Sequence, residues 1–321
     1  KLAKYYVSFG YVSNSGVFNT DKDVNTYNTN SKFNVLNIHG NLELNINKDF
    51  TIIADIKAKK DMRTVPGSYA ANYDENILST LYATPSNAFQ PITYNGQLGG
   101  WYNGSNPYGM LNHSGYSNFE TNYISTTIDL KYDLSDFIKG LSVIGYFGVN
   151  SSTDYVINRS KSFAYYILNS SATIWYKRGE DGAINGSGKY STIARKFDHM
   201  AGLNYKNSFG KNHLDATVMV DRQQLKEHLY SSIGETYQGI KGKVSYRYDD
   251  KYMLDIAASY QGSNYFPKDK RYGFFSAVSA GWLISNESFI ENKEMINMLK
   301  LRASWGKTGN GIGTANATYY G

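Results

Sequence analysis

The sequence predicts an all-β chain built from a long antiparallel sheet, and three observations support this. Of 321 residues, 30 are Tyr, 15 are Phe and only 5 are Pro, a composition that favours strands because aromatic side chains fit a pleated sheet. Several segments alternate apolar and polar residues over about ten positions, which is the pattern of barrel strands. Short polar turns also alternate with long polar connections along the chain, an asymmetry typical of barrels that span a membrane.

Residues 36–46, LNIHGNLELNI, show the alternation most clearly. Successive side chains of a strand point to opposite faces, so one face of this segment is apolar and the other is polar. In a soluble sheet the apolar face would lie in a core, whereas in a membrane barrel it would face lipid and the polar face would line the lumen. The apolar set is Leu36, Ile38, Leu42, Leu44 and Ile46, and the polar set is Asn37, His39, Asn41, Glu43 and Asn45.

The next segment predicts a hairpin with this strand. A three-residue turn at 47–49 places Ile46 opposite Phe50, so that Ile52 and Ile56 continue the same apolar face. Only an odd loop length brings both apolar sets to one face.

Counting the residues in each turn in the same way predicts hairpins further along the chain. A second three-residue turn, Asp-Asp-Lys, places Tyr248 opposite Tyr252. A four-residue loop at 208–211 would pair Tyr205 with Leu214. The strands on either side of each turn are therefore expected to be sheet neighbours.

Long polar connections separate these tight hairpins. They are expected at about 12–31, 64–117, 156–189, 226–236 and 261–271. The pattern predicts about eleven strands, with a short amphipathic helix at 286–298 before the last one. Because single-chain bacterial barrels have even strand numbers and the chain starts at Lys1 without Met, we expect the sequence to be a piece of a longer protein.

Composition and motifs argue against several function classes. The chain has no Cys, which excludes disulfide frameworks and thiol nucleophiles, and its five His show no metal-ligand spacing. No catalytic constellation or phosphate loop is present, so we expect neither an enzyme nor a cofactor. The net charge of +6 is spread along the chain. Its two dense basic runs, 57–60 and 268–271, are interpreted as solvated loop or lumen faces rather than nucleic-acid sites.

Two long connections carry clusters of aromatic and amide side chains. They lie within 94–116 and 172–190, and the first has few charges. Flat rings beside amides suit sugar faces or peptide backbones, whereas the alternative is a loop stabilised by its own aromatics. The candidate binding residues are Trp101, Tyr102, Asn103, Tyr108, Trp175 and Tyr176, and the low charge favours a neutral oligosaccharide over a peptide.

The C-terminal third resembles a known family. The residues that carry the resemblance are the Asp-Asp-Lys-Tyr turn at 249–252, the strand GFFSAVSAGW at 273–282 and the stretch LKLRASWGKTGN at 299–310. They are similar to the barrel of SusC/RagA-type TonB-dependent transporters, and earlier segments fit the same family. The family often has Arg-Asp before the Gly-Ser that follows the Asp-Asp-Lys-Tyr hairpin, where this chain has Tyr260 and Gln261.

The resemblance implies a transmembrane β-barrel of the outer membrane in a Bacteroidota-type cell. Such barrels have about 22 strands around a plugged lumen, so residues 1–321 would form part of one barrel domain, about half of its wall, without the plug or the remaining strands. It also implies nutrient uptake, most often of an oligosaccharide and sometimes of a peptide, as in RagA-like transporters. The implied partners are a SusD-like surface lipoprotein, TonB-ExbB-ExbD acting through the missing N-terminal region, outer-membrane lipid and a second transporter–lipoprotein pair in a homodimer.

On this interpretation the lipid-facing residues are Leu36, Ile38, Leu42, Leu44, Ile46, Ile52 and Ile56. The competing interpretation is a soluble, Tyr-rich β protein that binds carbohydrate. The two interpretations differ in whether the apolar face of the sheet is covered.

The alternation predicts a difference between neighbouring positions in the intact protein. Leu44→Arg should destabilise the barrel by about 2–4 kcal/mol if Leu44 lies near the bilayer midplane. Asn45→Arg, one residue away on the opposite face, should cost much less. Unfolding titrations in lipid vesicles would measure both, and equal costs would contradict the face assignment.

Overall fold

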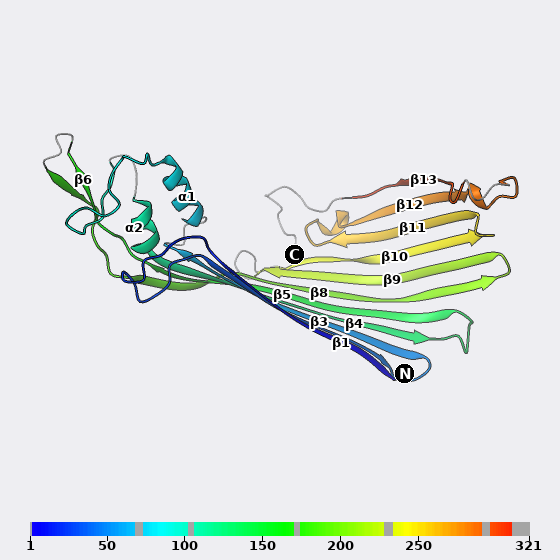
Figure 1. The fold of residues 1–321 in the computed structure, drawn as a ribbon. Coiled ribbons are helices and arrows are strands. Elements are labelled where there is room, and N and C mark those ends of the chain that lie inside the picture. Colours follow the sequence, from blue (N-terminus) through cyan, green and yellow to red (C-terminus); the bar gives the residue numbers. More distant parts are fainter. Residues whose placement is uncertain are drawn as a thin grey trace.

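The computed structural model describes residues 2–309 apart from 68–72, 102–105, 170–173, 228–233 and 291–295. Within these residues the dominant feature is one antiparallel sheet of eleven strands (Figure 1). Its strands follow chain order, so each pairs with the strands before and after it. They are β1 (Ala3–Ser15), β2 (Lys32–Asn45), β3 (Phe50–Pro66), β4 (Gly115–Asp133), β5 (Leu141–Ser160), β8 (Asn185–Phe209), β9 (Asn212–Glu227), β10 (Glu235–Tyr248), β11 (Tyr252–Ser263), β12 (Tyr272–Leu283) and β13 (Lys300–Gly306).

Smaller elements lie in the connections. A separate two-stranded sheet consists of β6 (Tyr165–Leu168) and β7 (Trp175–Arg178). The helices are α1 (Tyr73–Ala83), α2 (Pro107–Asn112) and the 3₁₀ turns η1 (Lys268–Lys270) and η2 (Ile284–Asn286). Among the helices in the described part of the chain, none has the length and apolarity needed to span a bilayer.

The strand register joins the apolar sets of all eleven strands into one continuous face. Each apolar residue has an apolar or small neighbour on most adjoining strands, because the pairing keeps the same parity from β1 to β13. One row runs Tyr5, Leu42, Ala54, Ile128, Phe147, and on the C-terminal strands another runs Val244, Ile256, Val278, Trp305. Nothing in the described chain covers many of these side chains; Ile56, for example, is 52% exposed.

The seven residues predicted to face lipid all lie on this face. Ile38, Leu42, Ile46 and Ile56 are exposed, and the other three are partly exposed. All strands of the sheet except β13, which has seven residues, are also longer than the roughly ten residues that a tilted barrel strand needs to cross the hydrocarbon. That the face contacts lipid stays a prediction.

Two of the predicted hairpins have the expected register. Ile46 donates its N–H to the Phe50 carbonyl at 2.9 Å across the three-residue turn. Tyr248 pairs with Tyr252, and their rings stack with centroids 6.4 Å apart. The odd turn length therefore sets the register in both hairpins.

The predicted register of the hairpin between β8 and β9 is wrong by two residues. Tyr205 pairs with Ala216 rather than Leu214, because the turn contains only Gly210 and Lys211. Gly210 has φ +58°, and glycine at the first central position is what a two-residue II′ hairpin requires. The error leaves the faces unchanged, since a shift of two residues preserves parity.

The helix expected at 286–298 is also wrong for the residues that the structure describes. Only η2, which ends at Asn286, is helical, and 287–290 and 296–299 form turns and irregular chain. Residues 291–295 lie outside the described chain. The apolar residues of this stretch, which include Phe289 and Met298, are largely exposed and do not form a packed helical face.

The long and short connections lie at opposite ends of the sheet. Figure 1 shows α1, α2 and β6 beyond one end of the strands and the tight turns, including the one between β8 and β9, at the other. The connections at the first end span 16–31, 67–114, 161–184, 228–234 and 264–271. This segregation agrees with the asymmetry expected from the sequence.

Gly140, in the turn before β5, should tolerate no larger residue. Its φ is +85°, and a Cβ there would lie 2.1 Å from the Lys206 carbonyl oxygen. Gly140→Ala should therefore destabilise the intact barrel by at least about 2 kcal/mol. Gly145→Ala is the matched control, because a Cβ at Gly145 would meet Leu130 at an ordinary 3.5 Å. Urea unfolding in lipid measures both, and equal loss in the two variants would refute the clash.

Candidate substrate-binding surfaces

Three long connections fold together into a cap beyond one end of the sheet. The cap comprises 16–31, 67–114 and 161–184, which include α1, α2, β6 and β7. Its small core contains Ile77, Met110 and Leu111, with Phe18 and Phe163 packed against it. Each fully buried apolar side chain contributes roughly 1.5–3 kcal/mol, so this core can hold the three connections in one arrangement.

Asn106 organises the middle of the cap. It has no exposed surface, and its side-chain amide donates to the Pro91 carbonyl at 2.8 Å and the Gly99 carbonyl at 2.9 Å. Its side-chain oxygen accepts from the backbone N–H groups of Tyr108 and Gly109 as the N-cap of α2. All four hydrogen bonds of a buried amide are thus made, which links α2 to the strip that precedes it. The Asn-Pro pair was a helix-start signal that could have predicted α2 from the sequence.

A second link joins the first connection to α2. The Tyr108 hydroxyl donates to Asp21 at 2.6 Å, and the Asp21 backbone N–H donates to the Asn112 side chain at 2.9 Å. The hydrogen bond from Tyr108 lowers the pKa of Asp21. Burial, followed by the same contact, raises the pKa of Tyr108 to about 12. This link is expected to weaken when the pH falls through the depressed pKa of Asp21.

The structure brings some of the predicted binding residues together and separates others. Gly99 forms a bridge with Tyr166 of β6, so the strip that ends at the half-buried Trp101 runs beside the β6–β7 hairpin. Trp175 and Tyr176 lie on β7, and Tyr176 is 53% exposed. Tyr108 instead lies half-buried in α2, and its hydroxyl donates to Asp21.

Tyr102 and Asn103, the other two candidate residues, lie outside the residues that the structure describes. The sequence left two interpretations of the aromatic side chains in these loops: they bind ligand, or they stabilise their own loops. The cap contains both exposed and packed aromatic side chains. Some aromatic side chains pack the loops, as Phe163 does, while Tyr82 and Tyr94 are 86% and 80% exposed.

The polar face of the sheet carries ion pairs along its strands. His39 lies 2.6 Å from Asp55, and Lys57 lies 2.9 Å from the other oxygen of the same carboxylate. Lys4 pairs with Glu43 at 2.7 Å in the same way. Exposed ion pairs add little stability. Their main effect is to give this face of the sheet a hydrophilic surface on which positive and negative charges nearly balance.

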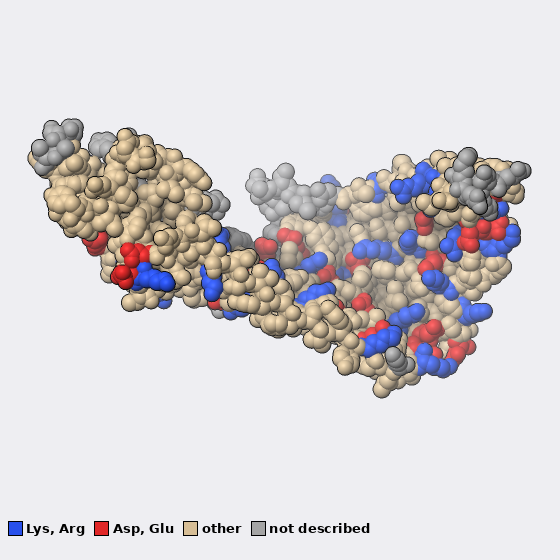
Figure 2. Space-filling model, viewed as in Figure 1, with Lys and Arg blue, Asp and Glu red and all other residues tan. Residues whose placement is uncertain are grey.

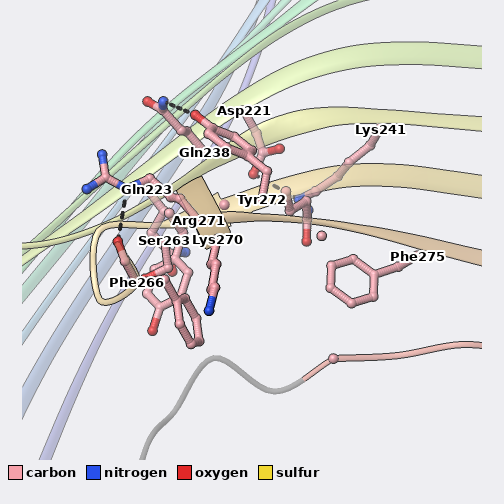
Figure 3. Close-up of a pocket in the computed structure, with 15 residues that line it drawn as sticks. Asp221, Gln223, Gln238, Lys241, Ser263, Phe266, Lys270, Arg271, Tyr272 and Phe275 are labelled. Carbon is pink, nitrogen blue, oxygen red and sulfur yellow. Dashed lines mark hydrogen bonds and ion pairs between the residues drawn. The ribbon is translucent and has the colours of Figure 1, made fainter. Parts of the chain in front are cut away.

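A pocket of about 430 Å³ lies on this polar face near the long connections (Figure 3). Its walls come from β9, β10, β11, β12 and the 264–271 connection. The lining side chains are mainly polar or aromatic and include Asp221, Gln223, Tyr237, Lys241, Gln261, Phe266, Lys270, Arg271 and Phe275. Sequence alternation indicates the face of each residue but not which strands converge, so the pocket was not predicted; only the basic run at 268–271 pointed to it.

Charge is distributed unevenly between the cap and the sheet. Figure 2 shows Lys, Arg, Asp and Glu gathered over the strands, while the face of the cap around α1 and α2 carries few of them. In the described residues, no group of three or more His, Asp or Glu side chains could hold a metal ion. The two candidate binding surfaces therefore differ in chemistry: the face of the cap around α1 and α2 carries few charges, whereas the wall is charged.

Comparison with known proteins gives the following relatives. No family model matches the chain. The TonB-dependent receptor SusC of Bacteroides thetaiotaomicron is 28% identical over 189 residues, which are 57% of this chain and 19% of SusC. The TonB-dependent receptor P26 of Formosa agariphila is 45% identical over 69 residues, or 22% of this chain and 7% of the receptor.

Solved structures with the same fold include the RagAB peptide transporter. It superposes on 97% of this chain with a TM-score of 0.65 and 16% identity. The 'open-open' state of the RagAB peptide importer superposes on 98% with a TM-score of 0.66 and 17% identity. This chain is similar to the β-barrel of SusC/RagA-type TonB-dependent transporters.

Transporters of this type are outer-membrane β-barrels, and the eleven-stranded sheet has the fold of such a barrel wall. The names of the relatives describe receptors, transporters and importers rather than enzymes. The chain covers 36% of the RagAB chain that it matches, and 7–19% of the curated relatives described above.

The buried amide of Asn106 gives a test of the cap. Asn106→Ala should destabilise the cap of the intact transporter by about 2–4 kcal/mol, because each buried polar group left without a partner costs roughly 1–3 kcal/mol. Asn87→Ala is the control, since Asn87 is exposed on the same connection. Hydrogen exchange of the amides in 106–114 measures the local opening, and unchanged exchange in Asn106→Ala would show that the amide is dispensable.

Proposed function

We propose that the intact protein imports an oligosaccharide across the outer membrane by TonB-dependent transport. The sheet supports a membrane location, because an apolar face left open across eleven strands is far larger than the apolar patches of soluble proteins. The whole chain is assigned to one β-barrel domain, since the sheet runs from β1 to β13 without a break. The soluble carbohydrate-binding alternative lacks a partner for that open face.

The cap is the observation that carries the substrate class. It presents exposed aromatic side chains beside amides at the end of the barrel where the long connections lie, and it carries few charges. Sugar rings offer apolar C–H faces and many hydroxyls, which aromatic rings and amides recognise together. The proposed ligand contacts are Trp101 and Trp175, with Tyr102, Asn103 and Tyr176 beside them.

The proposed partners follow from the family. A SusD-like lipoprotein would cover the cap side of the barrel, and TonB with ExbB and ExbD would supply energy through the N-terminal region. A homodimer of transporter–lipoprotein pairs is a further proposal. These assemblies would leave the apolar face of the sheet against outer-membrane lipid.

Peptide import is the alternative function. The RagAB structures are named as a peptide transporter and importer, but that cargo belongs to a protein with 16–17% identity to this chain, a level at which only the fold is shared. A peptide would use the cap amides and gain less from the flat Trp rings. The aromatic surface of the cap therefore favours a glycan.

Replacing the two Trp rings tests the proposal. Trp101→Ala with Trp175→Ala in the intact transporter should reduce uptake of the cognate oligosaccharide about tenfold, which corresponds to a loss of about 1.4 kcal/mol of binding free energy. Trp101→Phe with Trp175→Phe keeps flat rings and should retain most of the uptake. Unchanged uptake and affinity in the Ala variant would mean that these rings only pack their own loops.

A further inference from the structure

Two neighbouring pockets on the polar face of β9–β12 form one trough. The first, of about 430 Å³, lies next to the 264–271 connection, and the second, of about 320 Å³, lies further from the cap end of the strands. They share Lys241 and Phe275. The register places Asp221, Lys241 and Lys243 in successive rows along the trough, so it runs from the long connections toward the middle of the barrel wall.

The lining of the trough is cationic. Five basic side chains line it against the single carboxylate of Asp221, and they are Lys241, Lys243, Lys270, Arg271 and Lys307. Lys241 is held by Asp221 at 2.9 Å. No ion pair joins Lys243 or Lys270 to a carboxylate in the described chain, although most carboxylates on the polar face have a basic partner. The trough therefore departs from the balanced charge of the remaining wall.

Neutral groups that suit a sugar lie between these charges. Gln223, Gln261 and Tyr237 supply amides and a hydroxyl. The ring of Phe275 lies against two glycines: a Cβ would come within 2.8 Å of it at Gly273 and 2.3 Å at Gly309. Glycine at both positions leaves room for a flat aromatic surface in the trough.

We infer that this trough binds an anionic oligosaccharide segment, one whose sugars carry carboxylate or sulfate groups. Lys243, Lys270 and Arg271 would bind the anionic groups. The amides would bind hydroxyls, and Phe275 would pack against a sugar ring. This inference rests on the proposed function and refines it, because the cap by itself favours a neutral glycan and the wall adds a requirement for negative charge.

The position of the trough argues against an acidic peptide. Extended peptides gain affinity by adding to an open strand edge, but β10 and β11 are paired on both sides. The backbone N–H and C=O groups of the floor are therefore used within the sheet. The groups left to bind a ligand are separate side-chain hydrogen-bond donors and the ring of Phe275. These suit the hydroxyls and the isolated anionic groups of an acidic sugar.

Binding to the purified full-length transporter tests the inference with four probes. They are a short uronic-acid oligosaccharide, the same oligosaccharide with its carboxylates reduced to alcohols, a sulfated galactan oligosaccharide and oligoglutamate. The test variant is Lys243→Gln with Lys270→Gln. The control is Lys131→Gln with Lys139→Gln, which makes the same change in charge outside the trough, and Lys243→Arg with Lys270→Arg keeps the charge in place.

At least one acidic glycan should bind the wild-type transporter about tenfold more tightly than the reduced one, and this preference should weaken with added salt. The test variant should lose the tenfold preference for the acidic glycan, while the control and the Arg variant should keep it. Equal binding of the acidic and reduced glycans would overturn the inference and leave oligosaccharide import standing. Absence of binding by both acidic glycans would also overturn it. Binding of oligoglutamate alone, with the same sensitivity to Lys243 and Lys270, would overturn the glycan class as well.

Discussion

The structure depends on one constraint: an antiparallel register whose parity is preserved across all eleven strands. Backbone hydrogen bonding fixes which residues lie opposite each other, and side chains alternate between faces with a period of two. A slip of a single residue in any hairpin would move every later apolar side chain to the polar face. The rows described above from β1 to β13 keep the same parity. A one-residue register shift between β5 and β8, at Asp154 and Tyr155, lies beyond these rows toward the long connections. The separate apolar and polar faces of the sheet follow from this constraint.

The turns between strands maintain that parity by specific local chemistry. Asp249 and Asp250 both adopt positive φ, at 50° and 52°, a conformation that short polar side chains tolerate better than others. Neighbouring turns support them: Lys211 lies 2.9 Å from Asp249, and Lys251 bridges Asp249 and Glu287 at 3.3 Å each. Glu287 also accepts from the Tyr252 hydroxyl and the Trp282 indole. The Asp-Asp-Lys-Tyr motif thus connects three hairpin ends, which explains why its residue types go together.

At the other end of the sheet, the same strands present two surfaces of different character. The cap has its own small core and buried amides, and it exposes aromatic side chains with few charges. The trough on the wall has basic side chains that exceed its carboxylates. A ligand that entered from the cap side would meet aromatic contacts first and the cationic trough afterwards. Selection by shape and stacking would then precede selection by charge.

The sequence by itself determined the fold class, the number of strands, the two faces and the register of two hairpins, because alternation and turn length are local properties of the chain. It also carried the family resemblance through the motifs at 249–252 and 273–282. The sequence misplaced the β8–β9 register by two residues. The expected four-residue turn and the observed two-residue turn give the same two faces, and only the positive φ of Gly210 distinguishes them. The helix expected at 286–298 was wrong because apolar periodicity alone does not supply a surface to pack against.

Only the tertiary structure decided which residues meet. The cap depends on contacts such as Asp21 with Tyr108, and Asn106 with Pro91, which join distant parts of the chain. The trough requires side chains from four adjacent strands and one connection, and their convergence depends on the register of every hairpin between them. Local sequence gives each of these residues a face and a chemistry, but pairing across strands is a property of the whole sheet.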